Sequence, residues 1–256
     1  MSWDRNIVIK NEKELALLRE AGRVNALALK TVRQMIHPGV ATIDLDAAAE
    51  ELIRKHGGIP VFKGYPGAYP FPATLCISVN EELVHGFPSK RKLREGDIVS
   101  VDCGTLLEGF VGDSAFSMGV GEVSAKAQHL LQVTEQALSE GIAQMHPGNR
   151  TGDVSSAIQR YVEGQGFHVT REYTGHGVGR AMHEGPQVPN YGTPGRGVVL
   201  RPGMTIALEP MVLVGTPHTR VLQDQWTVVS ADGSLTAHFE HSVAVTAGEP
   251  LILTLE

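Results

Sequence analysis

The stretch HPGVATID at residues 37–44 returns later in the chain as HPGNRTGD at residues 146–153. The same spacing also pairs Gly57 with Gly166. In each copy an apolar helical pattern comes first, His-Pro-Gly interrupts it, and Thr-x-Asp opens a second helical pattern. The repeat therefore predicts a chain built from two similar halves.

The first copy indicates where its two helices begin and end. Asn11 followed by Glu14 is a capping-box pattern ahead of an apolar stripe, so a helix is expected to begin there. The Pro-Gly pair ends this helix, and Thr42 or Asp44 is expected to cap the next one. The second copy follows the same logic over about residues 125–166.

Strand patterns lie between and after the helix pairs, and Glu108-Gly109 has the character of a tight hairpin turn. Two helix pairs combined with antiparallel strands predict an α+β fold made of two pseudo-symmetric halves. We expect the halves to cover about residues 13–120 and 121–256 of one domain spanning 1–256. Strands are expected at residues 97–102, 110–113, 204–208, 211–214, 225–229 and 238–245.

Composition narrows the class of protein. The chain has 256 residues, 42% of them hydrophobic and 20% charged, which is typical of a soluble globular protein. A net charge of −6 argues against a nucleic-acid binder, although the basic stretch at 90–94 could contact ribosomal RNA instead of being a solvated loop. Two cysteines and no apolar run of about 20 residues predict a cytoplasmic protein that does not cross a membrane.

Four carboxylates interrupt apolar strand patterns. Asp102 follows Ile98 to Val101, and a turn at Glu108-Gly109 would place Asp113 opposite Gly104, diagonal to Asp102 on one face. Singly, each could be an ordinary strand-edge residue. As a set they indicate hard or borderline divalent metals. The four residues are Asp102, Asp113, Glu209 and Glu240.

Three histidines complete the candidate constellation. His176 lies among glycines in GHGVG, where backbone can approach a ligand closely, and His183 and His85 are further candidates. A lone histidine of this kind is often structural. One histidine combined with four carboxylates suits two bridged metals whose shared water becomes a hydroxide near neutral pH.

The chain resembles the type I methionine aminopeptidases, which have the pita-bread fold, from about residue 13 to residue 254. The motifs that carry the resemblance are NE at 80–81 with HG at 85–86, VD at 101–102 with Asp113, TGHGVG at 174–179, HEGP at 183–186, LEP at 208–210 and FEH at 239–241. The resemblance implies a single catalytic aminopeptidase domain that removes the initiator methionine from new proteins. It also implies a preference for substrates whose second residue is small.

The resemblance also implies roles for the site residues. His85 and His183 contact the scissile amide and the peptide carbonyl, and Glu209 moves a proton between water and the leaving amine. The implied metal ligands are Asp102, Asp113, His176, Glu209 and Glu240. The implied methionine pocket is Tyr65, Phe71, Cys76, Met182 and Trp226. Met182 replaces an aromatic that many relatives carry, and the pocket loop at 64–72 is longer than usual.

Two divalent ions (Co, Mn, Fe or Zn) are the expected cofactors, because carboxylate-rich sites accept all four. The expected partners are nascent polypeptide N-termini and, transiently, the ribosome, with no specific nucleic acid and a monomeric chain. Rival functions are a proline-specific aminopeptidase of the same fold, a non-catalytic binding protein and a metal-storage protein. The full set of five ligands and two histidines disfavours the binding protein, and a metal-storage protein does not explain His85 or the apolar pocket.

Overall fold

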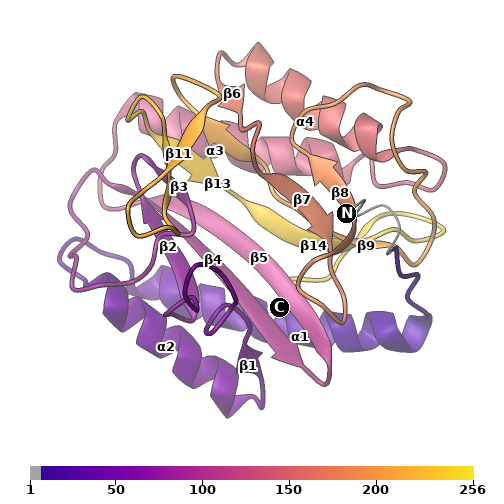
Figure 1. Cartoon of the computed structure of the whole chain (residues 1–256), viewed down its shortest axis with the longest axis horizontal. Helices are drawn as coiled ribbons and strands as arrows, with labels where there is room; N and C mark the ends of the chain where they lie inside the picture. Colours follow the sequence, from indigo (N-terminus) through magenta and orange to yellow (C-terminus); the bar gives the residue numbers. More distant parts are fainter. Residues whose placement is uncertain (1–6) are drawn as a thin grey trace.

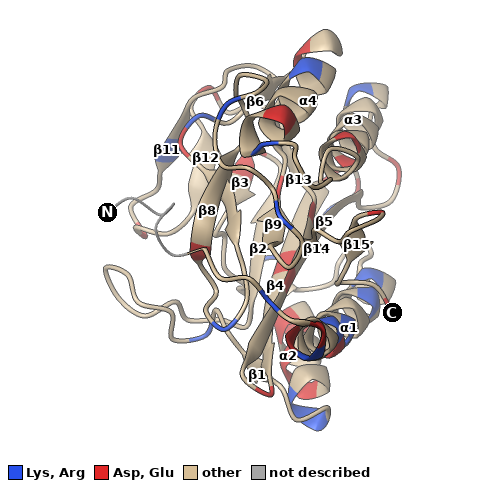
Figure 2. Cartoon of the chain, turned by 90° about the vertical axis from the view of Figure 1, so that its right-hand side faces the viewer, with Lys and Arg blue, Asp and Glu red and all other residues tan. Residues whose placement is uncertain are grey.

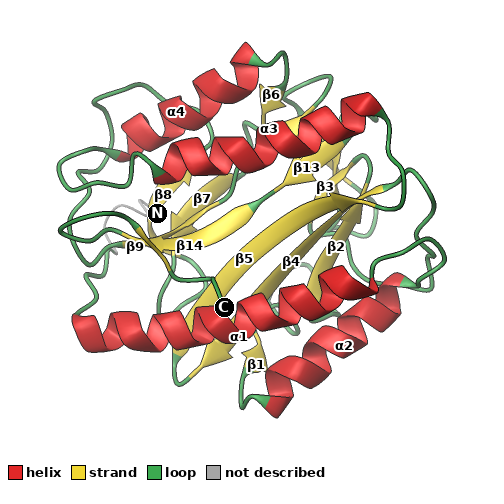
Figure 3. Cartoon of the chain, turned by 180° about the vertical axis from the view of Figure 1, so that it is seen from behind, coloured by secondary structure: helices red, strands yellow, loops and turns green. Residues whose placement is uncertain are grey.

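The computed structural model describes residues 7–256, which form an antiparallel sheet with helices on one face. In Figure 3 both helix pairs lie in front of the sheet, one across each half. The side view in Figure 2 confirms the two layers and shows basic and acidic residues interspersed along the helices. The helices of the described residues are α1 (Glu12–Met35), α2 (Thr42–Lys55), α3 (Ala125–Ile142) and α4 (Thr151–Gly164).

The main sheet joins the two halves of the chain through one strand pair (Figure 1). Strands from the first half end with β5, and β5 pairs with β14 from the second half. The path through the sheet is β1 (Ile59–Pro60), β4 (Ile98–Leu107), β5 (Phe110–Gly119), β14 (Glu240–Ala244), β9 (Thr205–Leu208), β7 (Thr174–Gly177) and β8 (Glu184–Pro189), with β2 (Leu75–Val79) beside β4 and β15 (Leu251–Ile252) beside β14.

Two small sheets extend the structure beside the main one. All strand pairs in residues 7–256 are antiparallel, as predicted. The small sheets are β13 (Thr236–His238), β10 (Met211–Leu213) and β6 (His168–Val169), and β11 (Thr219–Val221), β12 (Val228–Ser230) and β3 (Glu82–Val84). The predicted α+β architecture is therefore confirmed.

The predicted start of α1 is confirmed, but the predicted cap of α2 is wrong. Glu14 N donates to Asn11 Oδ1 at 3.0 Å, and Asn11 N donates to Glu14 Oε2 at 2.9 Å. The N-cap of α2 is Ala41, which has no capping side chain. Thr42 Oγ1 instead accepts from Ser89 N at 2.9 Å and donates to Ser89 O at 3.1 Å, so it holds a later loop rather than its own helix.

The second copy of the repeat makes a matching contact. Thr151 Oγ1 accepts from Val198 N at 3.1 Å, which again ties the helix start to a later loop. Gly39 and Gly148 both have left-handed backbones, with φ of 95° and 91°, and glycine is the residue that adopts them without strain. The two halves are thus similar in local structure as well as in the repeated sequence.

The hairpin that carries two of the candidate ligands has the predicted register. β4 and β5 meet at Glu108-Gly109, where φ is 48° and 80°, and Gly104 lies opposite Asp113. The two strands are longer than predicted. The predicted strand at 238–245 is divided, because His238 ends β13 in a small sheet and Glu240 begins β14 in the main sheet.

Buried apolar residues of all four helices pack on the sheet in one core. Examples are Val32 of α1, Leu45 of α2, Leu130 of α3, Ile158 of α4 and Val101 of β4. Among residues 7–256, none of the helices combines the length and apolar character needed to cross a membrane.

Glycines allow α1 to approach the sheet closely. A Cβ on Gly112 of β5 would lie 2.6 Å from the Cα of Gly22, and a Cβ on Gly22 would lie 2.2 Å from the carbonyl oxygen of Leu253. Both obstacles are backbone atoms, so a side chain rotation cannot relieve them. The backbone of α1 therefore lies against β5 and the C-terminal segment at this point.

We expect Gly22→Ala to lower the free energy of unfolding by about 1–3 kcal/mol, since the added methyl overpacks a buried contact. Urea denaturation measures the change. Gly164→Ala is the matched control, because nothing lies within 4 Å of a Cβ added near the end of α4. That variant should be unchanged or stabilised by about 0.5–1 kcal/mol. A Gly22→Ala protein as stable as the parent would contradict the close approach.

Candidate active site

One cavity of about 150 Å³ brings together every candidate site residue that the sequence suggested. Its walls come from both halves of the chain, with a charged side and an apolar side. The lining residues are Phe62, Tyr65, Phe71, Cys76, His85, Asp102, Asp113, His176, Met182, His183, Glu209, Trp226 and Glu240. Phe62 was missed by the sequence analysis, since nothing distinguishes it from any apolar residue ahead of a loop.

The carboxylates share one face of the main sheet because of strand register. Asp102 on β4 and Glu240 on β14 both lie opposite Ala115 of β5, one on either side. Asp113 precedes Ala115 by two residues, so its side chain points to the same face. Ser114, between them, points the other way and accepts from Asn25 of α1 at 2.8 Å. The carboxylates therefore face away from the helices.

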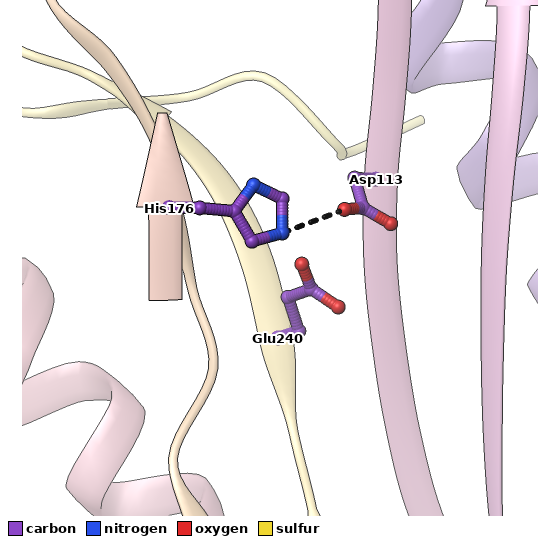
Figure 4. A group of neighbouring side chains, drawn as sticks. All are labelled: Asp113, His176 and Glu240. Atoms are coloured by element: carbon purple, nitrogen blue, oxygen red, sulfur yellow. Dashed lines mark ion pairs between the residues drawn. The ribbon is translucent and has the colours of Figure 1, made fainter. Parts of the chain in front are cut away.

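Three potential metal donors, one each from β5, β7 and β14, come together on one face of the main sheet (Figure 4). One ligand atom each from Asp113, His176 and Glu240 lies within 4.8 Å of the others. His176 Nε2 is 3.7 Å from Asp113 Oδ2 and 3.5 Å from Glu209 Oε1. His176 Nδ1 donates to Gly177 O at 3.0 Å, and this tautomer leaves the Nε2 lone pair free for a metal.

The electrostatics of the carboxylates indicate that a cation belongs among them. Burial raises the pKa of Asp113 to about 7. Burial first, and then neighbouring carboxylates, raise the pKa values of Asp102, Glu209 and Glu240 well above the usual range. Asp102 Oδ1, Asp113 Oδ1 and Glu240 Oε1 are buried and have no hydrogen-bond partner among residues 7–256. A bound divalent cation would remove both the repulsion and the unpaired oxygens, so these residues fit the metal.

The two histidines that were assigned to substrate lie beside this cluster. The His183 ring is 4.3 Å from the His176 ring, and the Tyr65 hydroxyl is 2.7 Å from His183 Nδ1. His85 has a left-handed backbone with φ of 60°, and its ring meets Trp226 edge-on. Burial, and secondarily His183, lowers the pKa of His85 to about 4. Its ring is therefore neutral at pH 7 and able to donate one hydrogen bond.

An apolar cluster closes the other side of the cavity. Its buried members include Phe62, Phe71 and Cys76, and Tyr65, Phe87, Met182 and Trp226 pack against them. The Phe71 and Trp226 rings are 5.1 Å apart and nearly perpendicular. All five residues predicted for the methionine pocket are in this cluster, which adds Phe62 and Phe87.

A buried ion pair that the sequence analysis missed fixes the turn carrying Met182 and His183. Lys10 Nζ pairs with Glu184 Oε2, and their side chains are only 2% and 8% exposed. Glu184 Oε1 accepts from Arg180 N at 2.8 Å and Ala181 N at 3.3 Å. The N-terminal segment thus orders a turn of the active site that is distant in sequence.

His238 is a second residue that the sequence analysis passed over, as part of an expected strand. Its Nε2 is 3.6 Å from Glu209 Oε2 and 3.9 Å from Glu240 Oε2. Burial, and secondarily His85, lowers its pKa to about 3, so the ring is neutral. Its two-residue spacing from Glu240 was a possible signal, because alternate strand residues share a face.

Buried carboxylates and a histidine on one sheet face are the donor set of a divalent-metal site. The model of metallopeptidase family M24 matches residues 16–247, and the chain belongs to this family. The fold is accordingly the pita-bread fold, as predicted.

Relatives in the family are close over nearly the whole chain. The methionine aminopeptidase of Clostridium perfringens is 49% identical over 249 residues, covering 97% of this chain and 99% of that protein. Methionine aminopeptidase 1 of Bacillus subtilis is 50% identical over 240 residues, covering 94% and 96%.

Solved structures agree with the described fold. The structure of methionine aminopeptidase from Thermotoga maritima matches with a TM-score of 0.95 and 49% identity, covering 98% of this chain and 100% of that one. Prolidase from Pyrococcus furiosus matches with a TM-score of 0.78 at 21% identity, over 97% of this chain and 66% of that one. The prolidase likeness shows the shared fold alone.

We expect metal addition to stabilise the metal-free protein, and the gain to grow as pH rises from about 6.5 to about 8. Burial raises the pKa of Asp113 in the folded protein to about 7. The stability that the protonated carboxyl contributes is therefore present at low pH and is lost as pH rises through 7, where the buried carboxylate becomes charged. A divalent ion compensates the charges that then form. Thermal unfolding of chelator-treated protein with and without Mn²⁺ measures this.

The control for this pH dependence is Asp113→Asn, which replaces the carboxylate by a neutral amide. That variant should lose part of the pH dependence and most of the gain from metal. If the parent protein melted at the same temperature with and without Mn²⁺ across this range, the carboxylates would not form a metal site.

Proposed function

We propose that the chain removes the N-terminal methionine from nascent polypeptides, favouring a small second residue, with two divalent ions (Co, Mn, Fe or Zn). The observation that carries this proposal is the shared cavity, in which a set of metal donors faces an apolar pocket. The proposed ligands are Asp102, Asp113, His176, Glu209 and Glu240.

The chemistry of each residue follows from its place in the cavity. The bound ions would supply Lewis-acid polarisation of the scissile carbonyl and activation of the attacking water. Glu209 accepts the proton of that water and passes it to the leaving amine. Neutral His85 and His183 contact the scissile amide and the carbonyl and stabilise the charge that develops there. Asp102 faces the free amino group of the substrate, which restricts cleavage to chain ends.

The apolar side of the cavity supports methionine as the residue that is released. Phe71 and Trp226 form perpendicular aromatic walls, and buried Cys76 lies on the strand beside Asp102. An unbranched thioether side chain fits such aromatic and sulfur surroundings. Tyr65 and Met182 complete the pocket at its edge.

The wider setting is proposed on the same basis. Substrates are nascent polypeptide N-termini, reached in the cytoplasm during transient contact with the ribosome, by a monomer. Residues 1–256 are proposed to act as a single catalytic domain, which the β5–β14 pairing across the halves supports. The basic stretch at 90–94 is no specific nucleic-acid site in this proposal, since Arg91 Nη1 pairs with Glu82 Oε1 at 2.7 Å.

The proposal is tested by methionine release from a Met-Ala-Ser peptide, with chelator-treated protein resupplied with Mn²⁺, Co²⁺, Fe²⁺ or Zn²⁺ in turn. We expect metal-dependent release of methionine alone and none from the N-acetylated peptide, because the free amine is needed. Release from an Xaa-Pro peptide instead would favour a proline-specific enzyme. If two ions bound and no methionine were released, the result would favour a binding protein over an enzyme.

We expect Trp226→Ala to reduce the preference for Met over Leu at the first residue by about tenfold, since a pocket wall is lost. The ratio of kcat/KM for Met-Ala-Ser and Leu-Ala-Ser measures it. Tyr191→Ala is the matched control, because Tyr191 is an exposed aromatic that stacks on Arg171 outside the cavity. An unchanged preference in Trp226→Ala would place the pocket elsewhere.

A further inference from the structure

The backbone of His238 is held in place by a buried serine. Ser117 Oγ on β5 accepts from His238 N at 2.9 Å and donates to His238 O at 2.7 Å. His238 also lies opposite Met211 in the pairing of β13 with β10. One side chain thus satisfies both backbone polar groups of His238 and fixes the backbone position from which the His238 imidazole extends.

The imidazole of His238 is buried with a nitrogen that the fold leaves unpaired. The side chain is 2% exposed, and Nε2 has no hydrogen-bond partner in the part of the chain that the structure describes. Its nearest acceptors are Glu209 Oε2 at 3.6 Å and Glu240 Oε2 at 3.9 Å. A buried nitrogen without a partner destabilises the folded state.

The two oxygens of Glu209 face two different imidazoles. Oε1 lies 3.5 Å from His176 Nε2, and Oε2 lies 3.6 Å from His238 Nε2. His176 belongs to the group of three close metal donors, and in residues 7–256 His238 belongs to no such group. His238 thus lies against the Glu209 oxygen that does not face His176, a place from which it can orient that carboxylate.

We propose that His238 is a positioning residue whose Nε2–H, 3.6 Å from Glu209 Oε2 in this structure, closes to a hydrogen bond with that oxygen when metal binds and so orients the carboxylate, with Glu240 Oε2 as the neighbouring acceptor. This inference rests on the proposed metal site. A neutral imidazole in the Nε2–H tautomer supplies the donor without adding a charge. Groups that hold metal ligands in this way commonly contribute 10–100-fold to metal affinity.

The test compares His238→Leu with His238→Gln, which keeps an N–H donor on a side chain of similar length. Calorimetric titration of Mn²⁺ should show about 10–100-fold weaker binding for His238→Leu. His238→Gln should recover most of the affinity. The visible absorption spectrum of the Co²⁺ protein should change in His238→Leu and return towards the parent in His238→Gln.

Stability of the metal-free proteins separates positioning from a structural role. His238→Leu should be as stable as the parent or more stable, because an unpaired buried nitrogen is removed. His241→Leu is the matched control. His241 Nδ1 bonds Thr254 Oγ1 at 2.8 Å, so this variant should lose stability and keep its Mn²⁺ affinity.

Two results would overturn the inference. Mn²⁺ affinity of His238→Leu equal to that of the parent would show that His238 does not orient Glu209. Loss of one bound ion in both His238 variants would make His238 a ligand instead. If the parent bound no metal or released no methionine, the proposed function would fail rather than the positioning role alone.

Discussion

The repulsion between buried carboxylates is the constraint on which the rest of the structure depends. Four acidic side chains converge on one face of a sheet, and three of their oxygens have no hydrogen-bond partner within the described residues. Such a cluster is tolerable as a cation site. Burial is the first cause that raises the pKa values of all four groups, and the neighbouring carboxylates raise those of Asp102, Glu209 and Glu240 further. The cluster consists of Asp102, Asp113, Glu209 and Glu240.

Local geometry explains why much of this arrangement was predictable from sequence. A strand alternates its side chains, and a two-residue turn sets the register, so Glu108-Gly109 alone brings Asp113 opposite Gly104. The helix pairs were predictable for a different local reason, because residues with strong backbone preferences lie at helix ends. The identities of the metal donors and pocket residues came from motifs and were then found in one cavity. Their roles stay predictions.

The features that sequence could not supply depend on contacts between distant segments. Thr42 resembles a helix cap, but its hydroxyl bonds Ser89, a partner no local pattern reveals. Lys10 pairs with Glu184, and each taken alone is an ordinary charged residue. The chain also leaves one strand for another at Phe239, so the expected strand at 238–245 is divided between two sheets. Period-two patterning carries no sign of such a change.

Because the candidate metal site lies where the two halves meet, metal binding would also stabilise the fold. Asp113 comes from the first half, whereas His176 and Glu240 come from the second, and the β5–β14 pair brings them together. Neither half contains the group of three donors. Because an ion that binds the folded chain stabilises it by mass action, metal binding favours the same β5–β14 pairing that assembles the cavity. Repulsion among these carboxylates disfavours their arrangement without metal, and the same repulsion gives the site its affinity for a cation.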